Sequence, residues 1–151
     1  MTSTQTTPDG IILFAHGSRD ALWRGPIEAV AQRIRLNWPS QPVACAYLEL
    51  CEPNLHDATK LMMEQLQSAP KIIATDAYFM PANGSKPLKI RIVPMFLGMG
   101  KHAREDLPEL VAQLRAKHPL VEFEVTPTIG EDERVTRLLA QIAINAPSDI
   151  L

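Results

Sequence analysis

The stretch GIILFAHGSRD, residues 10–20, joins an unbroken apolar run to a polar loop that contains His16. The run Gly10–Ala15 is too short for a buried helix, and its continuous apolar character is typical of a strand that is covered on both faces. The residues after the loop then recur with helical spacing. This stretch therefore predicts the first strand–helix unit of an α/β fold, with a histidine just beyond the carboxyl end of the strand.

The alternation of strand and helix continues along the chain. The first helix is expected to begin near Pro26 and to end at Trp38–Pro39, because its apolar residues follow the spacing i, i+3, i+4, i+7 and i+11. The residues on that face are Ile27, Val30, Ala31, Ile34 and Trp38. Further strands are expected over Pro42–Leu48, Lys71–Phe79, Lys89–Phe96 and Leu120–Thr126.

Three more helices are predicted. The second opens at Pro53, and the third has Pro108 at its start and His118–Pro119 at its end. A last helix follows Gly130 and three acidic residues that suit the positive end of a helix dipole. The residues expected to face inward are Leu55, Ala58, Met62 and Leu66, then Leu107, Leu110, Val111 and Leu114, and finally Val135, Leu138, Leu139 and Ile142.

Such alternation predicts an α/β three-layer sandwich around a central, mostly parallel sheet of four to five strands. The chain of 151 residues is long enough for one compact domain, expected over residues 11–145. Residues 1–10 and 146–151 are expected to be short tails. In a parallel sheet, ligands bind beyond the carboxyl ends of the strands, so the residues that follow each strand are the candidates for function.

Composition excludes several classes of protein. A formal net charge of −2 argues against a nucleic-acid-binding protein, and no apolar run approaches the roughly 20 residues that cross a bilayer. The amino terminus has no apolar core of a signal peptide. Cys45 and Cys51 form no CxxC pair, so we expect reduced thiols in a cytoplasmic protein.

Two of the four histidines, His16 and His102, follow predicted strands at the same edge of the sheet. Glu49 and Glu52 follow the second strand, although Glu52 is equally well explained as an acid that precedes a helix. Two imidazoles and a carboxylate are ligands suited to divalent iron, cobalt, nickel or zinc, and the same groups accept protons near neutral pH. The spacing alone does not decide which acid completes the set.

Glycines and basic residues surround these candidates. Gly98 and Gly100 are expected to permit unusual backbone angles and the close approach of a ligand. Between Ala77 and Arg104 the chain has no acidic residue, and Arg19 and Arg24 flank the first loop. A polyanionic ligand would explain this charge, and solvated surface lysines would explain it equally well. The basic residues of the acid-free segment are Lys86, Lys89, Arg91, Lys101 and Arg104.

Three blocks of the sequence carry a family resemblance. LFAHGSRD (13–20), YLELCEPNL (47–55) and IRIVPMFLGMGKHAREDLPELV (90–111) are similar to the short, single-domain members of the CbiX/SirB class of sirohydrochlorin chelatases. The similarity extends from about Ile11 to Ala143, and the third block is the most specific. The resemblance implies a chelatase-like fold, which is a flavodoxin-like half-domain.

The resemblance also implies an activity: insertion of a divalent metal, Co²⁺ or Fe²⁺ with Ni²⁺ as a further alternative, into sirohydrochlorin on the route to cobalamin or sirohaem. It implies that His16 and His102 are metal ligands and bases, with Glu49 or Glu52 as the acid. Gly17 and Ser18 would leave room for the flat macrocycle, and Arg19, Arg24, Lys101 and Arg104 would pair with its carboxylates. No organic cofactor is expected.

Longer family members carry two such domains around one cleft, so a symmetric homodimer is expected here. One segment departs from the family pattern: an insertion over about residues 74–88 with strong turn chemistry at Met80–Ser85. It could form an added strand or a lid, and it leaves both histidine blocks intact.

Three other functions share some of these sequence features. A histidine-phosphatase-type enzyme would need an arginine where Ala15 stands, directly before His16 and Gly17. A serine hydrolase built on Ser18 and His16 has poor geometry and no GxSxG motif. A carrier that binds metal or tetrapyrrole without turnover would use the same residues as a chelatase, so the sequence does not distinguish these two.

Overall fold

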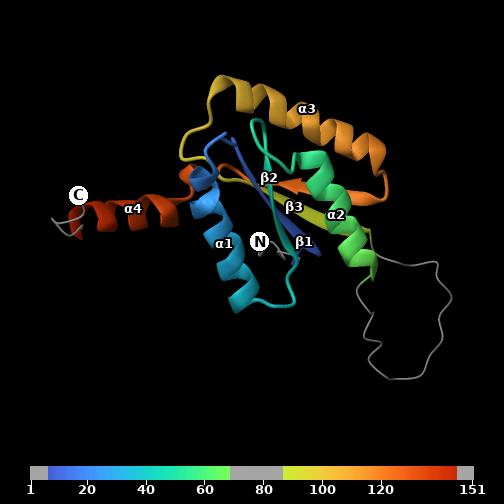
Figure 1. Cartoon of the computed structure of the whole chain (residues 1–151), viewed down its shortest axis with the longest axis horizontal. Helices are drawn as coiled ribbons and strands as arrows, with labels where there is room; N and C mark the ends of the chain where they lie inside the picture. Colours follow the sequence, from blue (N-terminus) through green and yellow to red (C-terminus); the bar gives the residue numbers. More distant parts are fainter. Residues whose placement is uncertain (1–6, 69–86, 146–151) are drawn as a thin grey trace, which may run out of the picture.

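The computed structural model describes residues 7–68 and 87–145. Within them, four parallel strands form one sheet in the order β2-β1-β3-β4, which confirms the expected α/β fold (Figure 1). The strand expected over Lys71–Phe79 lies outside the described residues. The strands are β1 (Gly10–Ala15), β2 (Val43–Tyr47), β3 (Leu88–Pro94) and β4 (Val121–Val125), and the helices are α1 (Gly25–Asn37), α2 (Leu55–Ser68), α3 (Lys101–Lys117) and α4 (Glu133–Asn145), with short 3₁₀ helices η1 (Ala21–Arg24) and η2 (Ile129–Glu131).

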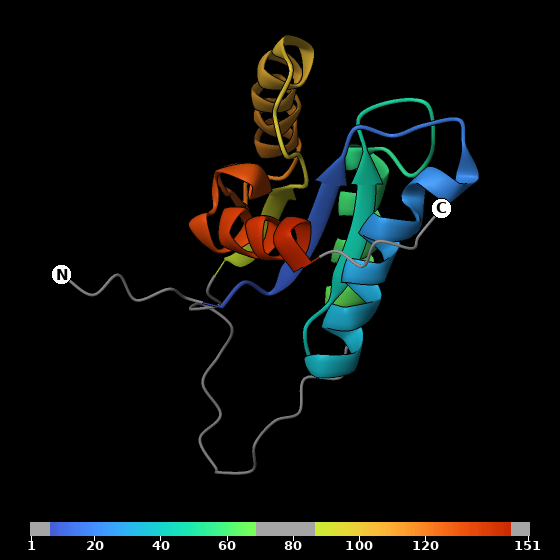
Figure 2. The ribbon, with the colours of Figure 1, turned by 90° about the vertical axis from the view of Figure 1, so that its left-hand side faces the viewer.

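The sheet is covered differently on its two faces. Helices α2 and α3 lie on one face and α1 on the other, where α1 contacts β1 and β2 (Figures 1 and 2). The larger core lies beneath α2 and α3, and Ile12, Phe14, Ile90 and Ile92 at its centre are fully buried. Each such side chain stabilises the fold by about 1.5–3 kcal/mol. A smaller cluster beneath α1 includes Leu13, Ala31 and Val43.

The register brings the strand ends to one edge of the sheet. Leu13 in the middle of β1 pairs with Cys45 of β2 on one side and with Val93 of β3 on the other. The chain is already part of the sheet before residue 11. Gly10 belongs to β1, and the Asp9 N–H donates to the carbonyl of Lys89 in β3 at 2.8 Å. The expected tail over residues 1–10 is therefore too long at its inner end.

Helix α2 confirms its predicted inward face. Leu55, Ala58 and Met62 are buried and Leu66 packs against the same core. On α1 the prediction is wrong for two positions, since Val30 is 38% exposed and Trp38 is 60% exposed. The contacts of α1 with the sheet are to β1 and β2, and Trp38 borders a groove instead of a packed neighbour.

The prediction that Pro108 starts the third helix is wrong, because α3 begins at Lys101 and Pro108 lies inside it. Proline removes one N–H from a helix interior, so this position is unfavourable by itself. Pro108 lies on the exposed side, while the opposite side is anchored by buried residues. Those buried residues are Ala103, Leu107, Val111 and Leu114.

The prediction that the last helix faces inward is also wrong. No residue of α4 is buried, and Leu138, Leu139 and Ile142 are 55%, 44% and 55% exposed. Helix α4 makes its main contacts with η2 and extends away from the sheet (Figure 1). Among the described helices, none has both the length and the apolar composition needed to cross a membrane.

Candidate functional site

The carboxyl edge of the sheet carries the candidate residues. Because the strands are parallel, the residues that follow β1, β2 and β3 emerge at the same edge. His16 directly follows β1, Glu49 lies two residues beyond β2, and a loop after β3 leads to His102 at the start of α3.

His16 and Glu49 form the closest contact between candidates. The His16 Nε2 atom lies 3.4 Å from Glu49 Oε1, and both side chains are about half exposed. The backbone brings them together, because the pairing of β1 with β2 continues past the strands. The Leu48 N–H donates to the Ala15 carbonyl at 2.9 Å, and the Glu49 N–H donates to the His16 carbonyl at 3.0 Å.

The other imidazole nitrogen defines what this pair can do. His16 Nδ1 lies 3.3 Å from the Gly17 carbonyl oxygen, which only accepts, so Nδ1 is the donor in this contact. A neutral imidazole then has its lone pair on Nε2, which faces the Glu49 carboxylate. A proton between the two atoms satisfies both, and so does a divalent cation.

Gly17 has a structural role that the sequence did not reveal. Its φ is +98°, and a Cβ atom built there would lie 1.8 Å from the carbonyl oxygen of Glu49. Only glycine fits both the backbone angle and the space. Gly17 therefore permits the contact between the first loop and the second, which keeps His16 beside Glu49.

Glu52 has a different position from Glu49. Its Oε2 atom accepts from the Asn54 backbone N–H at 2.8 Å, and Asn54 Oδ1 in turn accepts from the Asp57 N–H at 3.0 Å. These bonds satisfy free N–H groups at the start of α2. Of the two acids that the sequence left open, the structure places Glu49 beside His16 and Glu52 at the start of α2.

His102 lies in the first turn of α3, with Gly100 as the residue that precedes the helix. Its side chain is exposed. Gly98 and Gly100 have no positive φ, contrary to the expected unusual angles, and a Cβ at either position would meet no atom within 4 Å. The space beside both glycines is therefore open.

The basic residues separate into two groups. The first group lies on segments of the carboxyl edge and consists of Arg19, Arg24, Lys101 and Arg104. Within it, Arg24 Nε is 3.9 Å from Glu28 Oε1, and Lys101 Nζ is 3.9 Å from Glu105 Oε1. The expectation that Lys89 and Arg91 belong to this group is wrong, because both lie in β3 and pair with acids of β4. Lys86 lies outside the described residues.

Ser18 and Asp20 organise the rest of the first loop. The Ser18 hydroxyl accepts from the Asp20 N–H at 3.1 Å, and the Asp20 carboxylate accepts from the Leu22 N–H at 2.9 Å. Asp20 is therefore the N-cap of η1, and Ser18 holds the backbone N–H of that capping residue.

Sequence reasoning missed Gly130. Its N–H donates to the Phe96 carbonyl at 2.9 Å, and a Cβ there would lie 1.9 Å from the carbonyl oxygen of Leu97. Gly130 thus lets η2 contact the loop between β3 and α3, which leads to His102. A glycine shortly after a strand is the only signal for this role in the sequence.

The edge is an open site and not a closed metal cage. Over residues 7–68 and 87–145, no group of three or more histidine, cysteine, aspartate or glutamate side chains is arranged to hold a metal ion. Tyr47, at the end of β2, keeps its proton near neutral pH, and burial raises its pKa further, from 10.0 to about 12. The pair of His16 and Glu49 is therefore the part of this edge that can bind a metal ion or a proton.

Comparisons with known proteins identify the family of this chain. The CbiX family model matches residues 10–146. The chain is 28% identical over 101 residues to a sirohydrochlorin cobaltochelatase of Methanopyrus kandleri, covering 67% of this chain and 57% of the relative. It is 26% identical over 135 residues to a sirohydrochlorin ferrochelatase of Priestia megaterium, covering 88% of this chain and 42% of the relative.

A solved structure has nearly the same length. The crystal structure of a cobalamin (vitamin B12) biosynthesis CbiX protein from Marinobacter aquaeolei VT8 superposes with a TM-score of 0.66 at 28% identity. The match covers 91% of this chain and 95% of that protein. In contrast, the chain spans about half the length of the two curated relatives above.

Proposed function

Since this chain belongs to the CbiX family, we propose that it is a sirohydrochlorin chelatase, a lyase-type enzyme that inserts a divalent metal into a tetrapyrrole. The proposed substrates are Co²⁺ or Fe²⁺ and sirohydrochlorin, on the route to cobalamin or sirohaem. The observation that carries the proposal is the 3.4 Å contact between His16 Nε2 and Glu49 Oε1 at the open edge of the sheet.

The reaction replaces two pyrrole N–H protons by one divalent ion, so the site must deliver a metal and accept protons. His16 and Glu49 can each do both, because an imidazole lone pair and a carboxylate oxygen bind a metal or a proton. Two donors hold an ion more weakly than a closed set of four protein ligands. This weakness suits a metal that must leave for the macrocycle, and no redox step or organic cofactor is required.

His102 is proposed to act on the metal and the basic residues of the edge on the macrocycle. The macrocycle carries eight carboxylates, and Arg19, Arg24, Lys101 and Arg104 are proposed to pair with them. The free N–H groups at the start of α3 add favourable partial charge for an anion. The open space beside Gly98 and Gly100 leaves room for the flat ring, and His102 is proposed to face its metal.

A homodimer in the cytoplasm completes the proposal. The Priestia megaterium relative is about twice as long and has room for a second domain, and a second copy would supply the equivalent residues here. Cys45 and Cys51 are free thiols in the structure, which suits a reducing compartment.

The decisive experiment measures the rate of metal insertion. The protein is mixed with sirohydrochlorin and Co²⁺ or Fe²⁺, and the change in absorbance of the tetrapyrrole is recorded over time. We expect His16→Ala and Glu49→Gln each to lower the rate at least tenfold. Glu52→Gln serves as the matched control and should retain most of the rate, since Glu52 contacts Asn54. Binding of tetrapyrrole without acceleration over the uncatalysed rate would support the carrier instead, and equal losses in all three variants would overturn the assignment of Glu49.

A further inference from the structure

A groove lies between helix α3 and the end of strand β4. Its volume is about 360 Å³, which is within the range typical of small-molecule sites. One side of α3 lines it, together with the ends of β3 and β4 and the loop between β3 and α3. His16 and Glu49 are not among the lining residues, so the groove is separate from the pair described above.

Helix α3 gives the groove an elongated shape. Its contribution consists of Arg104, Leu107, Pro108, Val111 and Arg115, which recur at the spacing i, i+3, i+4, i+7 and i+11 and so share one side of the helix. Leu107 and Val111 are buried and form the floor, whereas the two arginines are exposed. The arginines are separated by about 16 Å along the helix axis, so the floor between them suits an extended ligand.

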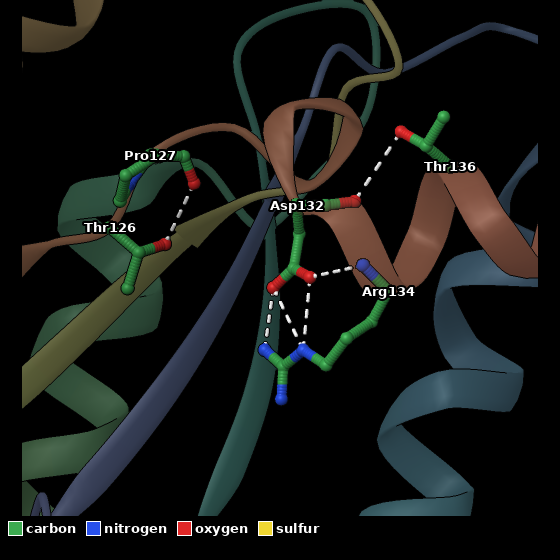
Figure 3. Close-up of polar contacts among 5 residues, drawn as sticks. All are labelled: Thr126, Pro127, Asp132, Arg134 and Thr136. Atoms are coloured by element: carbon green, nitrogen blue, oxygen red, sulfur yellow. Dashed lines mark hydrogen bonds and ion pairs between the residues drawn. The ribbon is translucent and has the colours of Figure 1, made fainter.

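The remaining wall is apolar and contains no aromatic ring. Pro94 ends β3, Val125 ends β4, and Met99 comes from the loop between β3 and α3. Thr126 is the polar residue of this wall, and its hydroxyl donates to the Pro127 carbonyl at 3.0 Å (Figure 3). The hydroxyl proton is therefore already used within the chain. Methionine, leucine and valine side chains pack well against a flexible aliphatic chain, whereas a flat aromatic ligand would find no ring to stack on.

The charge of the groove is positive and unbalanced. Two arginines line it, and no acidic residue does. One guanidinium nitrogen of Arg115 donates to the Phe123 carbonyl at 2.9 Å. Over residues 7–68 and 87–145, the side chain of Arg104 has no hydrogen bond or ion pair, whereas Arg91 in the sheet pairs with Glu124. A free guanidinium is suited to bind a carboxylate through two parallel hydrogen bonds.

We propose that this groove binds a medium-chain aliphatic carboxylate. The carboxylate pairs with Arg104 near the start of α3, and the chain lies over Leu107 and Val111 toward Arg115. An apolar floor with a single kind of charge at its ends selects for a ligand that has both parts, because an uncharged chain leaves the guanidinium unpaired and a short acid leaves the floor exposed. The site does not depend on the activity proposed above.

Titration of the full chain with octanoate, followed by NMR of labelled methyl groups, tests the site. The methyl signals of Met99, Leu107 and Val111 should move together and saturate. Butyrate should bind at least tenfold more weakly, because it buries fewer methylenes, and octan-1-ol at least threefold more weakly, because it lacks the charge. Shifts confined to the methyl groups of α4 would overturn the proposal, and so would equal affinities for octanoate and octan-1-ol.

Variants of α3 supply a second readout. Pro108→Glu places an acid in the groove without loss of helix propensity, and it should raise the dissociation constant of octanoate at least tenfold. Ala116→Glu adds the same charge outside the lining and should leave that constant within twofold. Arg104→Gln should weaken octanoate at least fivefold and leave octan-1-ol unchanged. Equal effects of Pro108→Glu and Ala116→Glu would overturn the proposal. Competition between sirohydrochlorin and octanoate for the same methyl signals would also overturn it, because the groove would then belong to the tetrapyrrole site.

Discussion

Two loops at the carboxyl edge are held in different ways: the loop after β1, which contains His16, and the loop after β3, which leads to His102. The loop with His16 is fixed from the side by the neighbouring loop, through Gly17 packed against the Glu49 carbonyl and through backbone hydrogen bonds. The loop before His102 is fixed from behind by Gly130, while Gly98 and Gly100 have open space beside them. The comparison teaches that one histidine is positioned by the chain itself, and the other lies where a large ligand has room.

Gly17→Ala should have the largest effect on stability and activity, because it removes the close packing of Gly17 against the Glu49 carbonyl that fixes the loop after β1. A side chain at positive φ is unfavourable, and the new Cβ would overlap the Glu49 carbonyl oxygen. We expect the free energy of unfolding to fall by about 2 kcal/mol or more and metal insertion to fall at least tenfold. Urea unfolding and the absorbance assay measure these, and an unchanged variant would contradict the described contact.

Gly130→Ala should come next and should act on the second loop. Its φ is not in the left-handed region, so the cost arises from the overlap with the Leu97 backbone alone. We expect a loss of about 1–3 kcal/mol, as for overpacking elsewhere. The rate of metal insertion should fall. The affinity of the His16–Glu49 pair for Co²⁺, measured by titration calorimetry, should stay within twofold of the wild-type value. A loss of that affinity would show that the two loops are not held independently.

The pH dependence of stability tests the turn behind the second loop. The Arg134 guanidinium lowers the pKa of Asp132 from 3.8 to about 2. A carboxyl with a depressed pKa stabilises the folded state above its unfolded pKa, and this contribution is lost as the pH falls from about 4 to about 2. The urea midpoints of the wild type and Asp132→Asn should therefore differ at pH 6 and converge near pH 2. The difference should be small, because the pair is exposed.

Gly98→Ala should have the smallest effect on folding. A Cβ there meets no atom within 4 Å, so we expect the free energy of unfolding to change by less than about 0.5 kcal/mol. A specific rise in the Michaelis constant for sirohydrochlorin, with stability unchanged, would support the view that the ring occupies this space. A marked loss of stability would contradict the open surroundings of Gly98.

Several features could be predicted because they depend on local patterns. The apolar run Gly10–Ala15 and the helical spacing in α2 each define an element and its buried side without knowledge of the neighbours. The local preference of proline for the start of a helix predicted a wrong boundary for α3, because tertiary packing outweighed it. Pro108 is tolerated inside α3 because the buried side of that helix anchors it, and packing of that kind is not visible in a residue preference.

The sequence by itself determined the alternation of elements, the parallel sheet and the placement of His16 and His102 after strands, because hydrophobic periodicity encodes them directly. Only the tertiary structure decided that Glu49 and not Glu52 lies beside His16, that Lys89 and Arg91 pair with β4, and that the stripe of α4 is uncovered. These facts depend on which segments meet in space. An amphipathic pattern states that a helix has an apolar side, and it does not state whether the partner of that side lies in the same chain.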